Sequence, residues 1–233
     1  GTVDSWMILN AIMDNGRKTK QNTYLLMADA EKCFDKLWLD DCLVDINKAG
    51  MREREVKMLK IMNEEVQIVI ETPVVKTKEN RKKNIVKQGT VFGPRLCCIN
   101  SEKVNEMKEQ AINVILPAIE VKGLAYVDDI LGAGSREHIE KIGKNLKEME
   151  EKKKYTFSNK NGKSHYMIVK TGKEKQDEPE IYVGKGKITK TTEYKYLGNW
   201  ITESGTVEKQ IKEVKNKMKA MISETIKISK DYG

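Results

Sequence analysis

Apolar and polar positions follow two periods along the chain, which separate stretches with helical spacing from short apolar runs typical of strands. Helical spacing predicts a helix over 3–13 that ends near Gly16, and further helices over 36–49 and 53–64. Strands are expected over six short stretches, which are 23–28, 66–70, 155–158, 164–169, 181–183 and 193–202. This irregular interleaving of helices and strands predicts the α+β class.

Turn and capping residues mark the remaining elements. Pro94 can open a helix because its missing N–H costs nothing in the first turn, and Ser135 can cap a long charged helix. Glycines bound an apolar stretch over 123–132 that carries a central polar pair, which predicts a β-hairpin. A very basic turn is expected over 76–83, and a final helix from 207 to about 229.

The charge and cysteine content narrow the class of protein. A formal net charge of +8 suits a polyanion such as nucleic acid, although a solvated lysine-rich surface has the same composition. The four cysteines lack the CxxC spacing of zinc sites, so we expect four free thiols in a reducing, intracellular compartment. No apolar run approaches the roughly 20 residues of a membrane span, so no membrane partner is expected. The chain starts at Gly1 in mid-pattern without an initiator Met, which suggests a fragment of a longer protein.

Three aspartates stand where strands are expected to end. Asp29 follows the apolar run 23–28, and Asp128 and Asp129 occupy the centre of the predicted hairpin. If the two strands are neighbours in one sheet, the carboxylates converge and form an oxygen-ligand site suited to Mg²⁺. Two such ions about 4 Å apart can activate a 3′-hydroxyl and hold the leaving pyrophosphate in a phosphoryl transfer. An Asp-Asp pair is also ordinary in turns, so this pattern alone leaves both interpretations open.

Five short stretches, in order over about residues 20 to 205, carry a resemblance to a known family. They are Asp29–Asp35 (D-x-x-x-A-F-D), Gln88–Leu96 (QGxxxSPxL), Tyr126–Asp129 (YxDD), Gly162–Ser164 (a lysine box) and Tyr196–Ile201 (a YLG segment). The set resembles the reverse transcriptases of non-LTR (LINE-type) retrotransposons. Three positions depart from the usual residues of these boxes, which are Cys33 in place of Ala, Gly93 in place of Ser and Val127 in place of Ala.

The resemblance implies a polymerase palm-like antiparallel sheet with helices packed on one face, partial fingers and a start of the thumb. Residues 1–22 would form a partial fingers or palm entry helix, 23–205 the palm with a finger-like segment at about 50–90, and 206–233 a thumb-proximal helix. The implied activity is RNA-directed DNA polymerase, adding deoxynucleotides to a primer 3′ end with two Mg²⁺ or Mn²⁺ ions. The implied partners are an RNA template, a DNA primer, deoxynucleoside triphosphates and the rest of a retrotransposon polyprotein, and the implied site of action is the nucleus.

The resemblance also assigns roles to individual residues. Asp29 and Asp128 would be metal ligands shared by both ions, Asp129 would support the site, and Lys163 would protonate the departing pyrophosphate. The substrate-binding residues would be Phe34 beneath the incoming sugar, together with Gln88, Gly89 and Tyr126. The nucleic-acid-binding residues would be Lys82, Lys83, Gly198 and Trp200. From spacing alone, a core Phe and a surface Lys are equally acceptable interpretations of Phe34 and Lys163. Aromatic strand residues are usually core, and a lysine run is more often merely solvated.

Other functional classes remain open at this point. The basic triphosphate-binding residues of the fingers find no match, so the chain can also be a catalytically incomplete palm remnant that only binds nucleic acid. A basic RNA-binding module without catalytic ancestry would not explain five ordered motifs. An RNA-dependent RNA polymerase usually carries Gly before its Asp pair, whereas Val127 stands there and Phe34 indicates DNA synthesis. No role is assigned to 101–121.

Overall fold

The computed structural model describes residues 2–30, 38–63, 65–77, 80–83, 86, 89–102, 114–116, 119–121, 124–126, 129–153, 156–158, 163–170, 178–183 and 186–232. The described helices are α1 (Thr2–Thr19), α3 (Leu39–Lys48), α4 (Glu53–Asn63), α5 (Gly93–Glu102), α6 (Arg136–Lys153) and α7 (Glu208–Tyr232). The longer strands are β1 (Thr23–Asp29), β2 (Glu65–Ile68), β3 (Asn80–Lys83), β7 (Asp129–Gly134), β8 (His165–Val169), β12 (Glu193–Tyr196) and β13 (Asn199–Thr202). The shorter strands are β4 (Val114–Leu116), β5 (Ile119–Val121), β6 (Leu124–Tyr126), β9 (Tyr182–Val183), β10 (Gly186–Lys187) and β11 (Thr189–Lys190).

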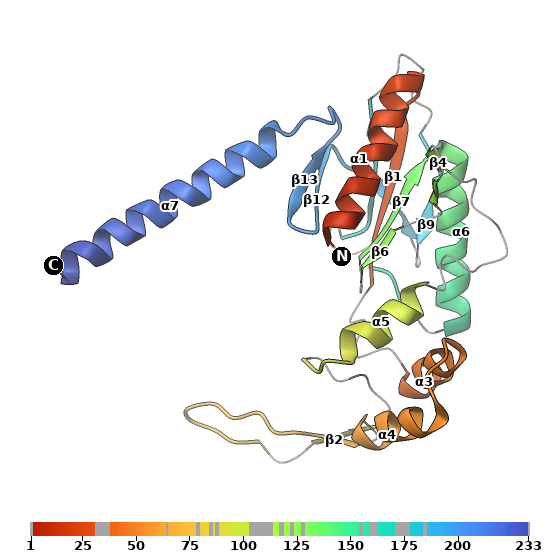
Figure 1. Ribbon diagram of the computed structural model, residues 1–233, viewed down its shortest axis with the longest axis vertical. Coiled ribbons are helices and arrows are strands. Elements are labelled where there is room, and N and C mark those ends of the chain that lie inside the picture. Colours follow the sequence, from red (N-terminus) through yellow and green to blue (C-terminus); the bar gives the residue numbers. More distant parts are fainter. Residues whose placement is uncertain are drawn as a thin grey trace.

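A five-stranded sheet in the order β11-β8-β1-β7-β6 forms the centre of the molecule (Figure 1). β1 pairs antiparallel with both β7 and β8, and β11 joins the edge parallel to β8. Because β1 is covered on both faces, its residues from Tyr24 to Ala28 form an unbroken apolar run, and all of them are buried. The predicted α+β class with a palm-like antiparallel sheet is confirmed.

The two faces of the sheet belong to two separate hydrophobic clusters. On one face, Leu26 and Ile168 belong to the same cluster as Ile142 of α6. On the other, Leu25 of β1 belongs to the same cluster as Leu9 of α1. The helices had been expected on one face of the sheet, but α1 lies on the other face. Successive residues of β1 point to opposite faces, so its Leu residues on both faces must be buried. α1 together with β12–β13 covers the second face.

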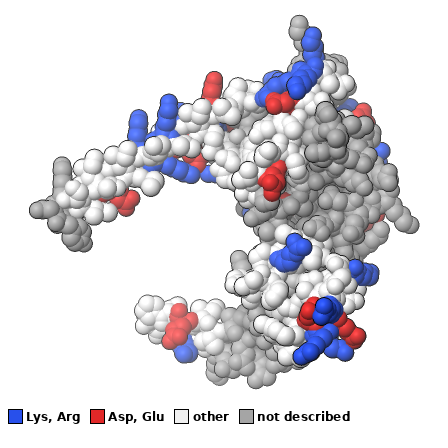
Figure 2. All heavy atoms as spheres, viewed as in Figure 1, with Lys and Arg blue, Asp and Glu red and all other residues white. Residues whose placement is uncertain are grey.

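Two projections leave this body and bound one open side. The helices α3, α4 and α5 pack below the sheet and continue its first cluster through Leu43, Leu59 and Leu96. From them the antiparallel ribbon β2–β3 projects outward, and α7 projects in the same general direction from the other end (Figure 1). The surface is hollowed between these two projections (Figure 2).

Several predicted boundaries need correction. The first helix does not end at Gly16, which is buried within α1, but continues to Thr19. It ends there because Lys20 adopts a left-handed φ of 57°. Residues 156–158 form an isolated bridge, Ala30 with Phe157, and not a strand. Part of the expected basic turn over 76–83 is β3, because its backbone pairs with β2. The segment 193–202, in contrast, is extended as expected and forms two strands joined by a turn.

Cysteine pairing also differs from the expectation. Cys42 and Cys98 are free, but Cys97 takes part in a disulfide, so the prediction of four free thiols is wrong for Cys97. Spacing along the chain cannot reveal such a bond, because it depends on which sulfur atoms the fold brings together. In the part of the chain that the structure describes, no helix is long and apolar enough to cross a bilayer.

Candidate active site

Two of the three predicted aspartates face each other at one end of the sheet. Asp29 is the last residue of β1 and Asp129 is the first residue of β7, and the antiparallel register pairs them directly. Directly paired residues have Cα atoms roughly 4.5–5.5 Å apart. By strand alternation both share the face of Leu25 and Leu131, the face that α1 covers further along. Both are only half-buried, so this end of the face is open to solvent.

Lys163 lies at the same end of the sheet, next to β8, which is the neighbour of β1 opposite β7. It lies two residues before β8, and β8 runs antiparallel to β1, so the start of β8 meets the end of β1. The Lys163 Nζ atom lies 3.1 Å from Oδ2 of Asp29. The Lys163 side chain is 58% exposed and that of Asp29 is 21% exposed. The strand order β8-β1-β7 therefore brings Lys163, Asp29 and Asp129 together from three distant parts of the chain.

Two serines hold the backbone of Asp29 in place. The Asp29 N–H donates to Oγ of Ser164 at 3.2 Å, and the Ser158 N–H donates to the Asp29 carbonyl at 2.9 Å. Both serines are buried, with 3% of their surface exposed. These bonds satisfy the backbone of Asp29 where the ladder with β8 ends, and leave its carboxylate to Lys163 and solvent. The sequence interpretation missed both serines, although Ser164 directly follows the predicted lysine.

Tyr196 of the β12–β13 hairpin is buried near the site. Its ring is almost fully buried and lies against Trp6 of α1, with 6.4 Å between ring centroids. Burial raises the pKa of the Tyr196 hydroxyl to about 12; Ser5 opposes this shift and the negative charge of Asp129 adds to it. The Tyr196 side chain is therefore a neutral phenol within electrostatic range of Asp129.

The remaining predicted substrate residues are only partly described. Phe34, Gln88 and Asp128 lie outside the described residues, and Tyr126 is placed by its backbone, which pairs with Asp129 across the β6–β7 hairpin. Gly89 precedes α5 with a φ of +84°, and a Cβ there would meet nothing within 4 Å. Its backbone conformation, and not crowding, is therefore what favours glycine.

The predicted nucleic-acid-binding residues fall into two places far from each other. Lys82 and Lys83 belong to β3, where they pair with Val66 and Glu65 of β2 in the projecting ribbon. Gly198 lies in the β12–β13 turn, where Leu197 and Gly198 have φ of 45° and 87°. Positive φ at both central residues is the signature of a type I′ turn, which matches the twist of a tight hairpin.

Trp200 follows this turn and contacts α7. Its backbone N–H donates to Oε1 of Gln210 at 3.0 Å, and its Nε1–H donates to Oε2 of Glu213. The Nζ atom of Lys209 lies 3.4 Å from the centroid of the indole ring, and that of Lys195 lies 5.6 Å from it. The interpretation of the sequence missed these partners, although Lys209 and Glu213 are four residues apart on a predicted helix.

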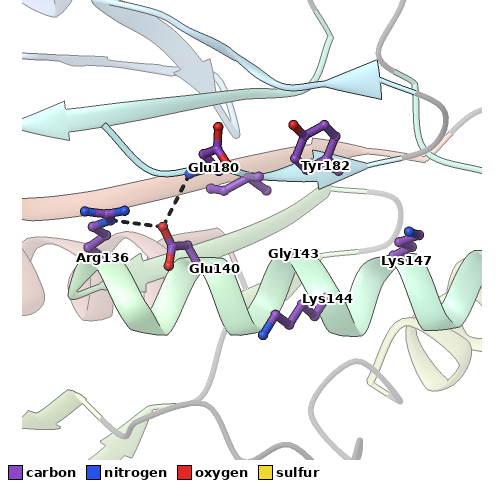
Figure 3. A pocket seen from close by; sticks show the side chains of 8 residues that line it. Arg136, Glu140, Gly143, Lys144, Lys147, Glu180 and Tyr182 are labelled. Carbon is purple, nitrogen blue, oxygen red and sulfur yellow. Dashed lines mark hydrogen bonds and ion pairs between the residues drawn. The ribbon is translucent and has the colours of Figure 1, made fainter. Parts of the chain in front are cut away.

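A second hollow lies away from the carboxylates, between α6 and the segment leading into β9 (Figure 3). Its volume is about 380 Å³. Glu140 crosses it, accepting from Arg136 Nε at 3.0 Å and from the Glu180 N–H at 3.3 Å. Gly143 forms part of its wall, and a Cβ there would approach Cγ2 of Ile181 to 2.6 Å. These contacts hold the β9 segment against α6, and no residue predicted for catalysis lines this hollow.

Comparison with known proteins identifies the family. A sequence profile described as reverse transcriptase (RNA-dependent DNA polymerase) matches residues 3–201, which is most of the chain. The chain belongs to the reverse transcriptase family. A search of curated proteins gave no match. Among solved structures, apo telomerase from Candida tropicalis, truncated from the C-terminal domain, is similar with a TM-score of 0.56 and 12% identity. The similarity covers 89% of this chain and 39% of that chain, and at this identity it shows the fold alone.

Reverse transcriptases generally use divalent metal ions, which require a set of oxygen ligands. Among the described residues, no three His, Cys, Asp or Glu side chains form a group that could hold a metal. The predicted triad includes Asp128, which lies outside those residues. Asp29 and Asp129 nevertheless supply carboxylate oxygens at one solvent-open point, and Asp29 already binds a cation, the Lys163 ammonium. This chemistry fits a hard divalent ion.

Proposed function

We propose that this chain is the catalytic palm of a non-LTR retrotransposon reverse transcriptase, which extends a primer with deoxynucleotides along an RNA template. The observation that carries the proposal is the strand order β8-β1-β7, which brings Lys163, Asp29 and Asp129 together at one solvent-open end of the sheet. Residues 23–205 would form the palm, with 1–22 as its entry helix and 206–233 as the thumb-proximal helix. The retrotransposon origin would place its work in the nucleus.

Asp29 and Asp128 would hold two divalent ions, and Asp129 would support them. Bound there, the ions would favour the deprotonated 3′-hydroxyl and neutralise charge on the triphosphate. The serine bonds hold the backbone from which the Asp29 carboxylate projects, and such preorganisation is a large part of catalysis by positioning.

Lys163 would act as the general acid for the leaving pyrophosphate. Its ammonium group lies 3.1 Å from a carboxylate oxygen of Asp29 and is mostly exposed, so it can turn from that oxygen toward a bound phosphate. The ammonium is also a point charge suited to phosphate oxygens. Lys163 would therefore stabilise the developing negative charge and then supply a proton to the oxygen that leaves.

Primer and template would lie in the hollow between the β2–β3 ribbon and α7 (Figure 2). Lys82 and Lys83 lie on the ribbon, and lysines of α7 project from both sides of that helix. Contacts of this kind fix the register of a nucleic acid through its phosphates and weaken with added salt. Gly198, at the tip of the β12–β13 turn, would approach the primer end closely because it has no side chain.

Phe34 is proposed as the residue that excludes ribonucleotides, with Gln88, Gly89 and Tyr126 completing the nucleotide site. In a polymerase-active form of the protein, Phe34→Ala should raise incorporation of ribonucleotides relative to deoxynucleotides, because the ring would no longer clash with the 2′-hydroxyl. The measurement is the ratio of kcat/KM for the two nucleotides. Tyr182→Ala, at an exposed aromatic residue of β9, is the matched control. An unchanged ratio for Phe34→Ala would remove this role.

Primer extension on poly(rA)/oligo(dT), with Mg²⁺ or Mn²⁺, tests the proposed activity directly. We expect extension by this chain and none by Asp128→Asn, since the substitution removes a proposed metal-binding charge. If neither protein extends the primer while both bind the duplex in a salt-dependent way, the chain is a binding-competent palm remnant and the catalytic proposal fails for it.

A further inference from the structure

The β12–β13 hairpin has two faces with different partners. Strand alternation places Tyr194, Tyr196 and Ile201 on the inner face, where they belong to the cluster that also holds α1 and the sheet. Lys195 and Trp200 are direct cross-strand partners and therefore share the outer face. The outer face contacts the first turns of α7, so the hairpin lies between the palm sheet and this helix.

Trp200 is the centre of the contact with α7. The indole uses its ring face, its Nε1–H and its backbone N–H for three different residues of the helix, which are Lys209, Glu213 and Gln210. A cation over an indole face is attracted by the ring quadrupole, and the attraction grows when the pair is partly removed from water. Lys209 has 30% of its side chain exposed, which meets that condition.

Glu213 links the same contact to both strands of the hairpin. Its carboxylate accepts from Nζ of Lys195 on β12 at 2.8 Å and from Trp200 on β13, and it pairs with Lys217 on α7 at 2.9 Å. Hydrogen bonds from Lys195, then Lys217 and Trp200, lower the pKa of the Glu213 carboxyl to about 2. The Glu213 carboxylate is therefore charged at any pH at which the protein would be assayed. Lys209 in turn pairs with Glu193 of β12.

The rest of α7 has no comparable burial. Residues 214–229 are all exposed, and the helix projects far from the body (Figure 1). A long helix held near one end has its direction set by the contacts at that end. Small changes at Trp200 would therefore become large displacements at the far end of α7.

We infer that Trp200 is a positioning residue, whose contacts with Lys209 and Glu213 fix the angle at which α7 leaves the β12–β13 hairpin. Through the hairpin, this contact ties the direction of α7 to the sheet that carries Asp29 and Asp129. The role goes beyond the proposed polymerase activity. It also differs from stacking on a nucleic-acid base, because the ring already carries a lysine ammonium 3.4 Å from its centroid.

The first measurement is the distance distribution between nitroxide labels on α6 and α7, by double electron–electron resonance in the full chain. Labels attached to p-acetylphenylalanine at positions 144 and 223 avoid the native cysteines. Glu213→Ala, Lys209→Met and Trp200→Phe should each broaden or shift the distribution, the last because Phe lacks the Nε1–H. Glu224→Ala is the matched control, an exposed glutamate on the same helix, and should leave it unchanged. An unchanged distribution in Trp200→Phe, or in both Glu213→Ala and Lys209→Met, would overturn the inference.

A second measurement, the Kd for a primer–template duplex, rests on the proposed function. A loosened α7 should raise this Kd roughly 3- to 10-fold in Glu213→Ala, although removal of a negative charge by itself would tighten binding to a polyanion. If Trp200 instead acted by stacking on a base, Trp200→Phe would largely retain binding and Glu213→Ala would not weaken it, which would overturn the positioning role. A changed label distance without any duplex binding would leave the inference standing and count against the proposed function.

Discussion

Asp29→Asn is expected to reduce nucleotide addition by roughly 10³- to 10⁴-fold, because a metal-held charge contributes several kcal/mol to phosphoryl transfer. The fold should survive, since the ion pair that the described residues give the Asp29 carboxylate is with a largely exposed lysine, and such pairs contribute about 1 kcal/mol or less. The measurement is single-turnover primer extension at saturating nucleotide, with the thermal unfolding midpoint recorded in parallel. That midpoint should fall by less than about 4 °C.

Asp14→Asn is the matched control for this substitution. Asp14 also forms an ion pair with an exposed cation, Arg17, but it lies on α1 and has no part in the proposed site. We expect it to leave the extension rate unchanged. Activity retained within about tenfold by a stably folded Asp29→Asn protein would contradict the assignment of Asp29 as a metal ligand.

Lys163→Met is expected to slow the chemical step by roughly 10²-fold or more, the usual contribution of a general acid. A slower rate alone would not separate proton donation from a role in holding Asp29. Deoxynucleotides with different β,γ-bridging groups make the distinction, because they vary the basicity of the leaving group. In the variant, the rate should depend more steeply on that basicity, since no acid then assists departure.

Two further proteins make this test specific to Lys163. Lys147→Met removes an exposed lysine of α6 and should change neither the rate nor its dependence on the leaving group. Lys163→Arg keeps a positive charge near Asp29 but offers a much weaker acid, so it should restore duplex and nucleotide binding more than the chemical step. Equal dependence on the leaving group in wild type and Lys163→Met would show that Lys163 is not the acid.

Local signals in the sequence were sufficient for most of the elements. The apolar run of β1, the proline that opens α5 and the serine that caps α6 each act within a few residues, and each was predicted correctly. The Ser135 Oγ, for example, accepts from the His138 N–H, as its position before a charged helix suggested. Among the predictions that were wrong are those for 156–158 and for the basic segment that includes β3, where pairing with a distant strand decides whether the backbone is extended.

The candidate site likewise contains residues that the sequence indicated and contacts that only the structure shows. Residue type and order along the chain were enough to propose Asp29 and Lys163, and the structure places them in contact. The roles of Phe34, Gln88 and Asp128 stay predictions, since these residues lie outside the described part of the chain. For Trp200, the aromatic residue was visible in the sequence, but its partners on α7 were not.

The sequence by itself determined the family and the order of the elements and pointed to the candidate carboxylates, because these depend on residue types and on spacing over short distances. Only the tertiary structure decided that α1 covers the second face of the sheet, that Ser158 and Ser164 hold Asp29, and that Trp200 is held by α7. Each of these is a contact between segments far apart in the chain. Such contacts follow from how complementary surfaces pack, and no local pattern encodes which surfaces will meet.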